Sequence, residues 1–146
     1  MKLTRFEHRW AQAALVAMFP GSREEGLADI AGMDVHGYLV EVMRSLPFKA
    51  RLGLRAAVWL VAFAPVFVLR RIVTISRLAP ADAESVVGAL CASSSYGVRS
   101  LAMLLKTFGA LLYAGDEAVR ARVRPAVPVT PAMTTVPLRI RRAHVA

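Results

Sequence analysis

The sequence predicts an all-α protein, with a single bundle of about five to six helices over residues 1–123 and an extended, proline-rich tail over residues 124–146. Three observations support this prediction. Apolar residues recur at helical spacing in most segments. Helix start and stop signals separate those segments. The β-branched runs at 66–68 and 72–75 have no hairpin partner nearby.

The first helix is expected to begin after Thr4, because Thr4 and Glu7 have the spacing of a capping box. Apolar residues then share one helical face until Pro20 and Gly21 end the helix. Residues 22–32 are polar, acidic and flanked by glycine, which predicts a loop.

A second helix is expected to start at Asp34, whose side chain can cap it, and to stop at Pro47. The third begins near Phe48 and continues into residues 56–69, fourteen residues without a charge. Pro65 is expected to interrupt this third helix, since proline removes a helical hydrogen bond.

The fourth helix is expected to start at Pro80, because proline suits the first turn and acidic residues follow it at 82 and 84. It should fade at the serines of 93–95. A fifth helix is expected from about Tyr96 to Ala114, with Gly115 as the residue just past its end. A short sixth helix then runs from Asp116 to about Val123.

The composition predicts a surplus of apolar surface on a basic chain. The sequence is 56% hydrophobic and has a formal net charge of +9, whereas an average domain is roughly 45–50% apolar. A chain of this size buries only about 68–70% of its unfolded surface by itself. Some apolar side chains are therefore expected to contact a partner protein, another copy of the chain, or a membrane.

The uncharged segment at 56–69 lies between Arg55 and Arg70. A membrane-spanning helix needs about 20 apolar residues, and shorter runs more often form core or interfacial helices. A core or interface helix is therefore favoured over a membrane-spanning one. The basic flanks and Trp59 leave open a third interpretation, a helix lying on a membrane surface.

No catalytic, cofactor-binding or metal site is predicted in this chain. Cys91 is the only cysteine, and the three histidines lack the spacing of a helical metal site. The acidic pairs stand at helix starts or in loops, where capping explains them. Nucleic-acid binding is not favoured, because the arginines are not interleaved with stacking aromatics.

The N-terminal residues carry charges with no apolar run behind them, so no signal peptide is predicted. A cytoplasmic location is expected, with membrane association as an alternative.

The order of the segments resembles a small helical module found with flavin enzymes. The motifs that carry this resemblance are Met18-Phe19-Pro20-Gly21, Leu46-Pro47, Ser76-Arg77-Leu78-Ala79-Pro80, and Tyr113 followed by Asp116. The chain is similar over about residues 5–123 to the region before the flavin domain of some glucose–methanol–choline (GMC) oxidoreductases. It is also similar to the separate small subunit of gluconate 2-dehydrogenase, the subunit 3 family.

In those proteins the small module is helical and non-catalytic, and the flavin belongs to the larger chain or domain. The resemblance therefore implies an accessory subunit that binds and stabilises a separate FAD-dependent GMC-type oxidoreductase, with FAD in that partner chain. Two departures stand out: a twin-arginine export signal is missing, and the proline-rich tail replaces the start of a dinucleotide-binding domain.

Partner contacts are predicted on the third helix, at Trp59, Phe63 and Phe67, against the alternative of ordinary core packing. The tail is the second predicted contact, against the alternative of disorder, through Pro125, Val127, Pro128, Val129, Pro131, Met133, Val136, Pro137, Leu138 and Ile140. Two other functions are considered: a peripheral membrane protein and a self-assembling helical scaffold.

Overall fold

The computed structural model describes residues 2–20 and 29–123, which contain six α-helices and no strand. The helices are α1 (Arg5–Met18), α2 (Val35–Ser45), α3 (Phe48–Val68), α4 (Pro80–Cys91), α5 (Tyr96–Gly115) and α6 (Glu117–Val123). Two short 3-10 turns, η2 (Ile30–Gly32) and η3 (Ile75–Arg77), lie between them. The all-α prediction is confirmed.

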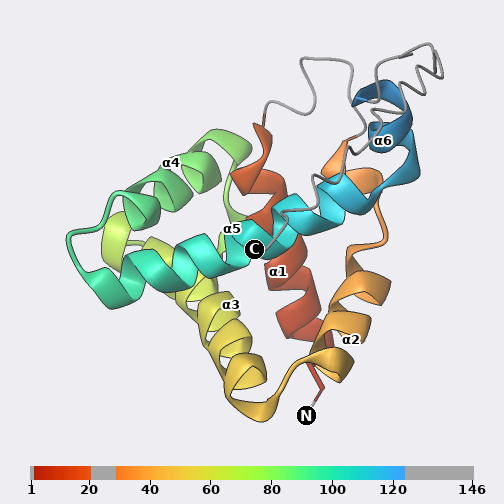
Figure 1. Ribbon diagram of the computed structural model, residues 1–146. Coiled ribbons are helices and arrows are strands. Elements are labelled where there is room, and N and C mark those ends of the chain that lie inside the picture. The colour runs from red at the N-terminus through yellow and green to blue at the C-terminus, as the bar shows by residue number, and fades with distance from the viewer. Residues whose placement is uncertain (1, 21–28, 124–146) are drawn as a thin grey trace, which may run out of the picture.

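Helix α1 lies in the middle of the bundle and packs against α2, α3, α4 and α5 (Figure 1). Helix α5 crosses both α1 and α3, and α6 packs against α5. The core is built from aliphatic side chains of helices α1 to α5 and of both 3-10 turns. Fully buried members include Leu15, Ile30, Leu39, Leu54, Val58, Val61, Ile75, Val86 and Leu105.

The predicted helix starts are confirmed by hydrogen bonds. The Glu7 N–H donates to Thr4 Oγ1 over 3.4 Å, and the Thr4 N–H donates to Glu7 Oε2 over 2.7 Å, which completes the capping box. Asp34 accepts from the Gly37 N–H at 2.8 Å, and Pro80 occupies the first turn of α4. Asp116 caps α6 by accepting from the backbone of residues 118 and 119.

The prediction that Pro65 interrupts the third helix is wrong. Helix α3 continues through Pro65 to Val68, and the Leu69 N–H donates to the Pro65 carbonyl at 3.0 Å. A proline so close to the end of a helix removes one backbone donor while the following turn still forms. The helix ends where Arg70 adopts a φ of +53°, a left-handed conformation that glycine usually supplies at such ends.

Two smaller boundaries differ from the sequence-based expectation. Residues 30–32 of the predicted loop form η2, because Asp29 caps the turn and Ile30 is buried in the core. Gly115 is the last residue of α5, and Asp116 follows it as the cap.

Helices α1 and α5 approach each other closely at Gly109. A Cβ atom added there would lie 2.6 Å from Leu15 Cδ2 and 2.6 Å from Phe19 Cε2. An added Cβ atom would have to displace these two side-chain ends, so the crossing of the two helices, and not backbone conformation, favours glycine at this position.

Candidate functional site

The outer face of α3 carries a continuous apolar stripe, here called the outer stripe. Its members are Phe48, Leu52, Ala56, Trp59, Phe63 and Phe67. At 100° per residue these positions fall within about 100° of one another, opposite the buried residues of the same helix. Phe48 is 65% exposed, Leu52 is 52% exposed and Phe67 is 80% exposed.

Two of the predicted contact residues are brought together in an aromatic cluster. Trp59 and Phe63 have ring centroids 5.5 Å apart, and Trp10 of α1 lies 5.5 Å from the first and 5.4 Å from the second. Both Trp10 contacts are edge-on, the geometry that aromatic pairs prefer. Trp59 remains 44% exposed and Phe63 is half-buried, so neither is an ordinary core residue.

Glu7 lies beneath this cluster and is only 1% exposed. Its Oε1 accepts from Trp59 Nε1 at 2.6 Å and from the Arg55 Nε, while its Oε2 accepts from the Thr4 N–H. Burial acts to raise the pKa of Glu7, but the hydrogen bonds from Thr4, Trp59 and Arg55 together lower it below the ordinary 4.5. The carboxylate is therefore ionised and ties α1 to α3.

The capping role of Glu7 was predicted from the sequence, but its ion pair with Arg55 was not. One signal for these contacts was present in the sequence. Arg55 and Trp59 are four residues apart on the third helix, so their two side-chain hydrogen-bond donors lie on one face. Nothing in the sequence indicates which helix supplies the acceptor.

A groove of about 350 Å³, lined by six apolar residues together with two arginines and a threonine, adjoins the outer stripe between α1, the second half of α3 and the segment after it. Its lining residues are Phe6, Arg9, Trp10, Phe63, Val66, Ile72, Val73, Thr74 and Arg77. Phe6 is 67% exposed and Ile72 is 94% exposed at its margin. Phe63 belongs to both the groove and the stripe, so the two form one apolar surface.

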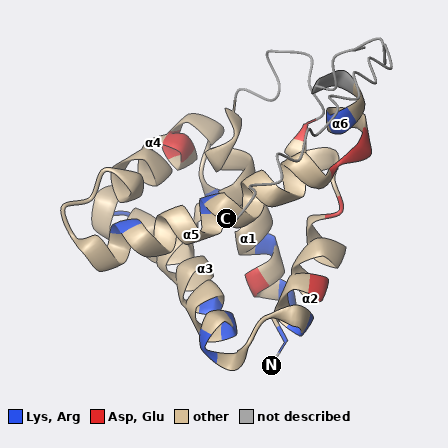
Figure 2. Ribbon diagram, in the orientation of Figure 1, with Lys and Arg blue, Asp and Glu red and all other residues tan. Residues whose placement is uncertain are grey.

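A second cleft, of about 720 Å³, lies where the N-terminal residues, α2 and the start of α3 meet; we call it the basic cleft. Its lining residues are Lys2, Leu3, Arg5, His8, His36, Leu39, Val40, Met43, Arg44 and Arg51. Figure 2 shows basic residues gathered at this end of the molecule. His8 and His36 belong to different helices and lack the spacing of a helical metal site in the sequence, yet their ring centroids are 4.1 Å apart.

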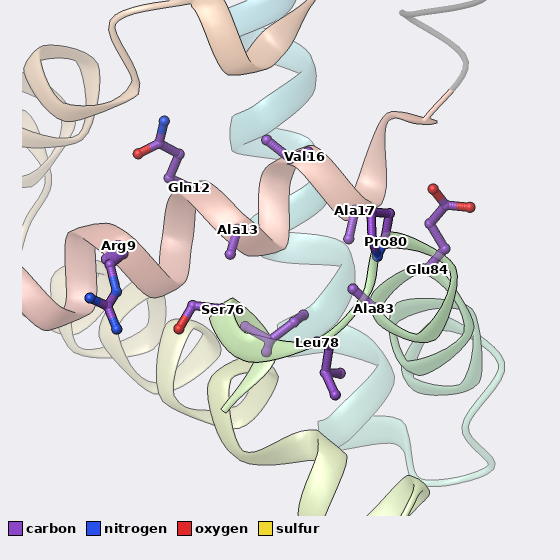
Figure 3. A pocket seen from close by; sticks show the side chains of 11 residues that line it. Arg9, Gln12, Ala13, Val16, Ala17, Ser76, Leu78, Pro80, Ala83 and Glu84 are labelled. Atoms are coloured by element: carbon purple, nitrogen blue, oxygen red, sulfur yellow. The ribbon is translucent and has the colours of Figure 1, made fainter. Parts of the chain in front are cut away.

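A third groove, of about 310 Å³, runs between α1, η3 and the start of α4 (Figure 3). Arg9 and Glu84 stand at its opposite ends, and small or apolar side chains line most of the space between them. Ser76 lines it too, and its hydroxyl lies 3.2 Å from that of Thr74. No nucleophile is paired with a base in this groove, and residues 2–20 and 29–123 hold no group of three or more metal-binding side chains.

Helix α3 is long and apolar enough to cross a membrane by length and composition, and 39% of its most apolar window is buried inside the bundle. Its inner face packs against α1, α4 and α5. Crossing a bilayer would therefore require α3 to leave the core that these helices share.

Comparison of the chain with models of protein families, with curated proteins and with solved structures finds no match. The resemblance to GMC-associated helical subunits stays a prediction from the sequence. The tail residues predicted to contact a partner, from Pro125 to Ile140, lie outside the described residues.

Proposed function

We propose that this chain is a non-catalytic accessory subunit that binds and stabilises a separate FAD-dependent GMC-type oxidoreductase through the outer stripe of α3. One observation carries the proposal. All four aromatic residues of α3 lie on the outer stripe, and none lies among its buried residues. Aromatic side chains dominate the energetics of protein interfaces, so their position favours a docking surface.

Burial of the stripe is the source of binding energy. Moving one exposed Phe or Leu side chain out of water contributes about 1.5–3 kcal/mol. Phe48, Leu52 and Phe67 are each more than half exposed. A partner that covers all three side chains would gain several times the binding free energy that one side chain contributes. In the chain alone these side chains stay exposed to water.

The shape of the surface favours a protein over a lipid layer. The groove beside the stripe is concave and lies between exposed Phe6 and exposed Ile72. A concave apolar groove suits a protruding side chain of a partner, which is how interface anchors bind. The identity of that partner as a flavin enzyme rests on the resemblance of the segments, and the FAD would be held by the partner.

A pair of charge insertions tests the proposal. Phe67→Glu places a carboxylate at the most exposed aromatic residue of the outer stripe, whereas Leu111→Glu places one on the exposed side of α5, where Leu111 is 56% exposed. The tagged full-length chain is purified from its native cell, and co-purified flavin is measured by its absorbance. Phe67→Glu should weaken the complex by about 2 kcal/mol or more, roughly 30-fold.

The control Leu111→Glu should retain the yellow partner at the wild-type level. Wild-type chain that co-purifies with no flavoprotein, or as a colourless homo-oligomer, would overturn the proposal. The second of these outcomes would instead favour a self-assembling scaffold.

A second candidate function is peripheral membrane association. It is supported by the position of Lys49 and Arg70 near the two ends of the exposed stripe, where cations can reach lipid headgroups. Flotation of the purified chain on phosphatidylglycerol-containing vesicles, abolished by Phe67→Glu, would favour this function over an enzyme partner.

A further inference from the structure

The basic cleft has a lining of one sign of charge. Its lining, among the described residues, includes Lys2, Arg5, Arg44, Arg51 and two histidines, but no carboxylate. The ion pairs that Glu7 and Asp82 form use Arg55 and Arg71, neither of which lines the cleft. The cleft therefore concentrates positive potential in a concave site, an arrangement that attracts an anion.

The three arginines of the cleft come from α1, α2 and the start of α3, and one of them is held in place by a hydrogen bond to the backbone. Arg51 donates its Nε–H to the Leu46 carbonyl at the end of α2 over 2.6 Å, which holds the guanidinium in place. An arginine has five N–H donors, so the others remain for a ligand. Arg5 and Arg44 are exposed and reach the cleft from α1 and α2.

The histidine pair adds a second observation. The rings of His8 and His36 are in contact, and the His8 Nδ1 is buried with no hydrogen-bond partner in the part of the chain that the structure describes. Two protonated imidazoles at this distance repel each other. Burial lowers the pKa of His8, the neighbouring His36 lowers it further, and Glu7 acts in the opposite direction. An anion bound in the cleft would stabilise the protonated rings and raise this pKa.

We propose that the basic cleft binds the phosphate group of a small molecule, with the apolar part of that molecule resting on the cleft's aliphatic residues. Leu39 and Met43 are buried in its floor, and Val40 is 45% exposed at its side. The volume is in the range of sites that take small molecules, about 300–1,000 Å³. Arginine is suited to phosphate because its planar fork can donate two parallel hydrogen bonds.

This site does not depend on the proposed enzyme partner. Its ligand is defined by one chemistry, a phosphate ester, which either a soluble metabolite or a lipid headgroup can present. The two sources differ in how the ligand is delivered, so the test has a soluble arm and a vesicle arm.

In the soluble arm, inorganic phosphate and glycerol 3-phosphate are titrated into the full-length chain while the NMR signals of the histidine rings are followed. We expect saturable shifts at His8 and His36. Arg5→Gln combined with Arg44→Gln should weaken binding by about tenfold or more, because it removes two charge-assisted contacts. The control, Lys106→Gln combined with Arg120→Gln, removes the same charge from exposed positions outside the cleft and should change affinity less than about twofold.

In the vesicle arm, flotation is measured on phosphatidylcholine vesicles with and without phosphatidylglycerol. Flotation that needs the anionic lipid and is lost in the Arg5/Arg44 double variant, but not in the Lys106/Arg120 control, supports the proposal with a headgroup as ligand. Saturable binding in the soluble arm supports it with a soluble phosphate ester.

Equal effects of the cleft and control variants in both arms would overturn the proposal, as would the absence of binding in both. Circular dichroism checks that the double variant is folded. If it is not, His36→Gln replaces it, since His36 is an exposed residue of the same cleft.

Discussion

Along α3, the buried face and the outer stripe are both apolar, but their side chains differ in size. The buried face includes three alanines and a proline beside Leu54, Val58 and Val61. The outer stripe has Trp59 and three phenylalanines. Small residues inside let α1, α4 and α5 approach closely, while the largest apolar surfaces of the helix remain available outside.

This difference shows that the hydrophobic content of a helix does not by itself indicate burial. A helix that served only the core would place its largest side chains inward, where they stabilise the fold most. In α3 the arrangement is reversed, which supports a role for the outer stripe in binding. Substitutions at buried positions should therefore change the stability of the protein much more than substitutions at exposed positions.

The largest expected effect is at Leu54. Leu54 and Leu52 are two residues apart on α3, one 0% exposed and the other 52% exposed. Leu54→Ala should lower the free energy of unfolding by about 3 kcal/mol, since it removes buried contacts and leaves a cavity. Leu52→Ala should change it by less than about 0.5 kcal/mol. Urea denaturation measures both, and similar losses for the two would contradict the division of α3 into two faces.

A smaller effect is expected at Glu7, the charge that joins the aromatic cluster to the core. Glu7→Ala should destabilise the protein by about 2 kcal/mol, because it leaves Trp59 Nε1 and the Arg55 side chain without their acceptor. Glu7→Gln retains the shape and should cost less. Urea denaturation midpoints of the wild type, Glu7→Gln and Glu7→Ala at neutral pH should fall in that order, with the wild type the most stable.

The same carboxylate predicts a pH dependence. The pKa of Glu7 in the folded chain lies below the ordinary 4.5, so its stabilising contribution is complete above that value and is lost as the pH falls through the folded pKa. The pKa of His8 is also lowered, from 6.5, so protonation of His8 destabilises the fold as the pH falls below this value. Glu7→Gln should remove the loss of stability that occurs below pH 4.5. It should keep the loss of stability that protonation of His8 causes below pH 6.5.

The smallest effect is expected at two helical glycines. Gly109→Ala introduces a Cβ against Leu15 and Phe19 and should destabilise by about 1 kcal/mol, since overpacking outweighs the better helix propensity. Gly88→Ala meets nothing within 4 Å and should stabilise α4 by about 1 kcal/mol. Thermal unfolding of the two variants in opposite directions would confirm that the α1–α5 crossing is tightly packed.

Local signals predicted most of the fold. The Thr4–Glu7 capping box, the Asp34 cap, the break at Pro47 and the start at Pro80 all lie where the sequence placed them. Each depends on residues within one helical turn, so no tertiary information is needed. Pro65 was misjudged because its burial against neighbouring helices keeps the last turn of α3 in place, and that packing is not local.

The site was predicted less completely. Trp59 and Phe63 were identified from their position on an apolar helix, but their contact with Trp10 depends on how α1 crosses α3. The pairing of His8 with His36, and the gathering of Arg5, Arg44 and Arg51 around it, likewise depend on the packing of α1, α2 and the start of α3. Spacing along the chain cannot show which faces of separate helices will meet.

The hydrogen bonds of Glu7 also constrain the order of assembly during synthesis. Arg55 and Trp59 follow Glu7 by 48 and 52 residues, so a ribosome completes α1 well before either donor is made. The capping box can form in the nascent helix, but the Oε1 atom can leave water only when α3 arrives. Docking of α1 and burial of its carboxylate should therefore occur as one late step, after the third helix has emerged.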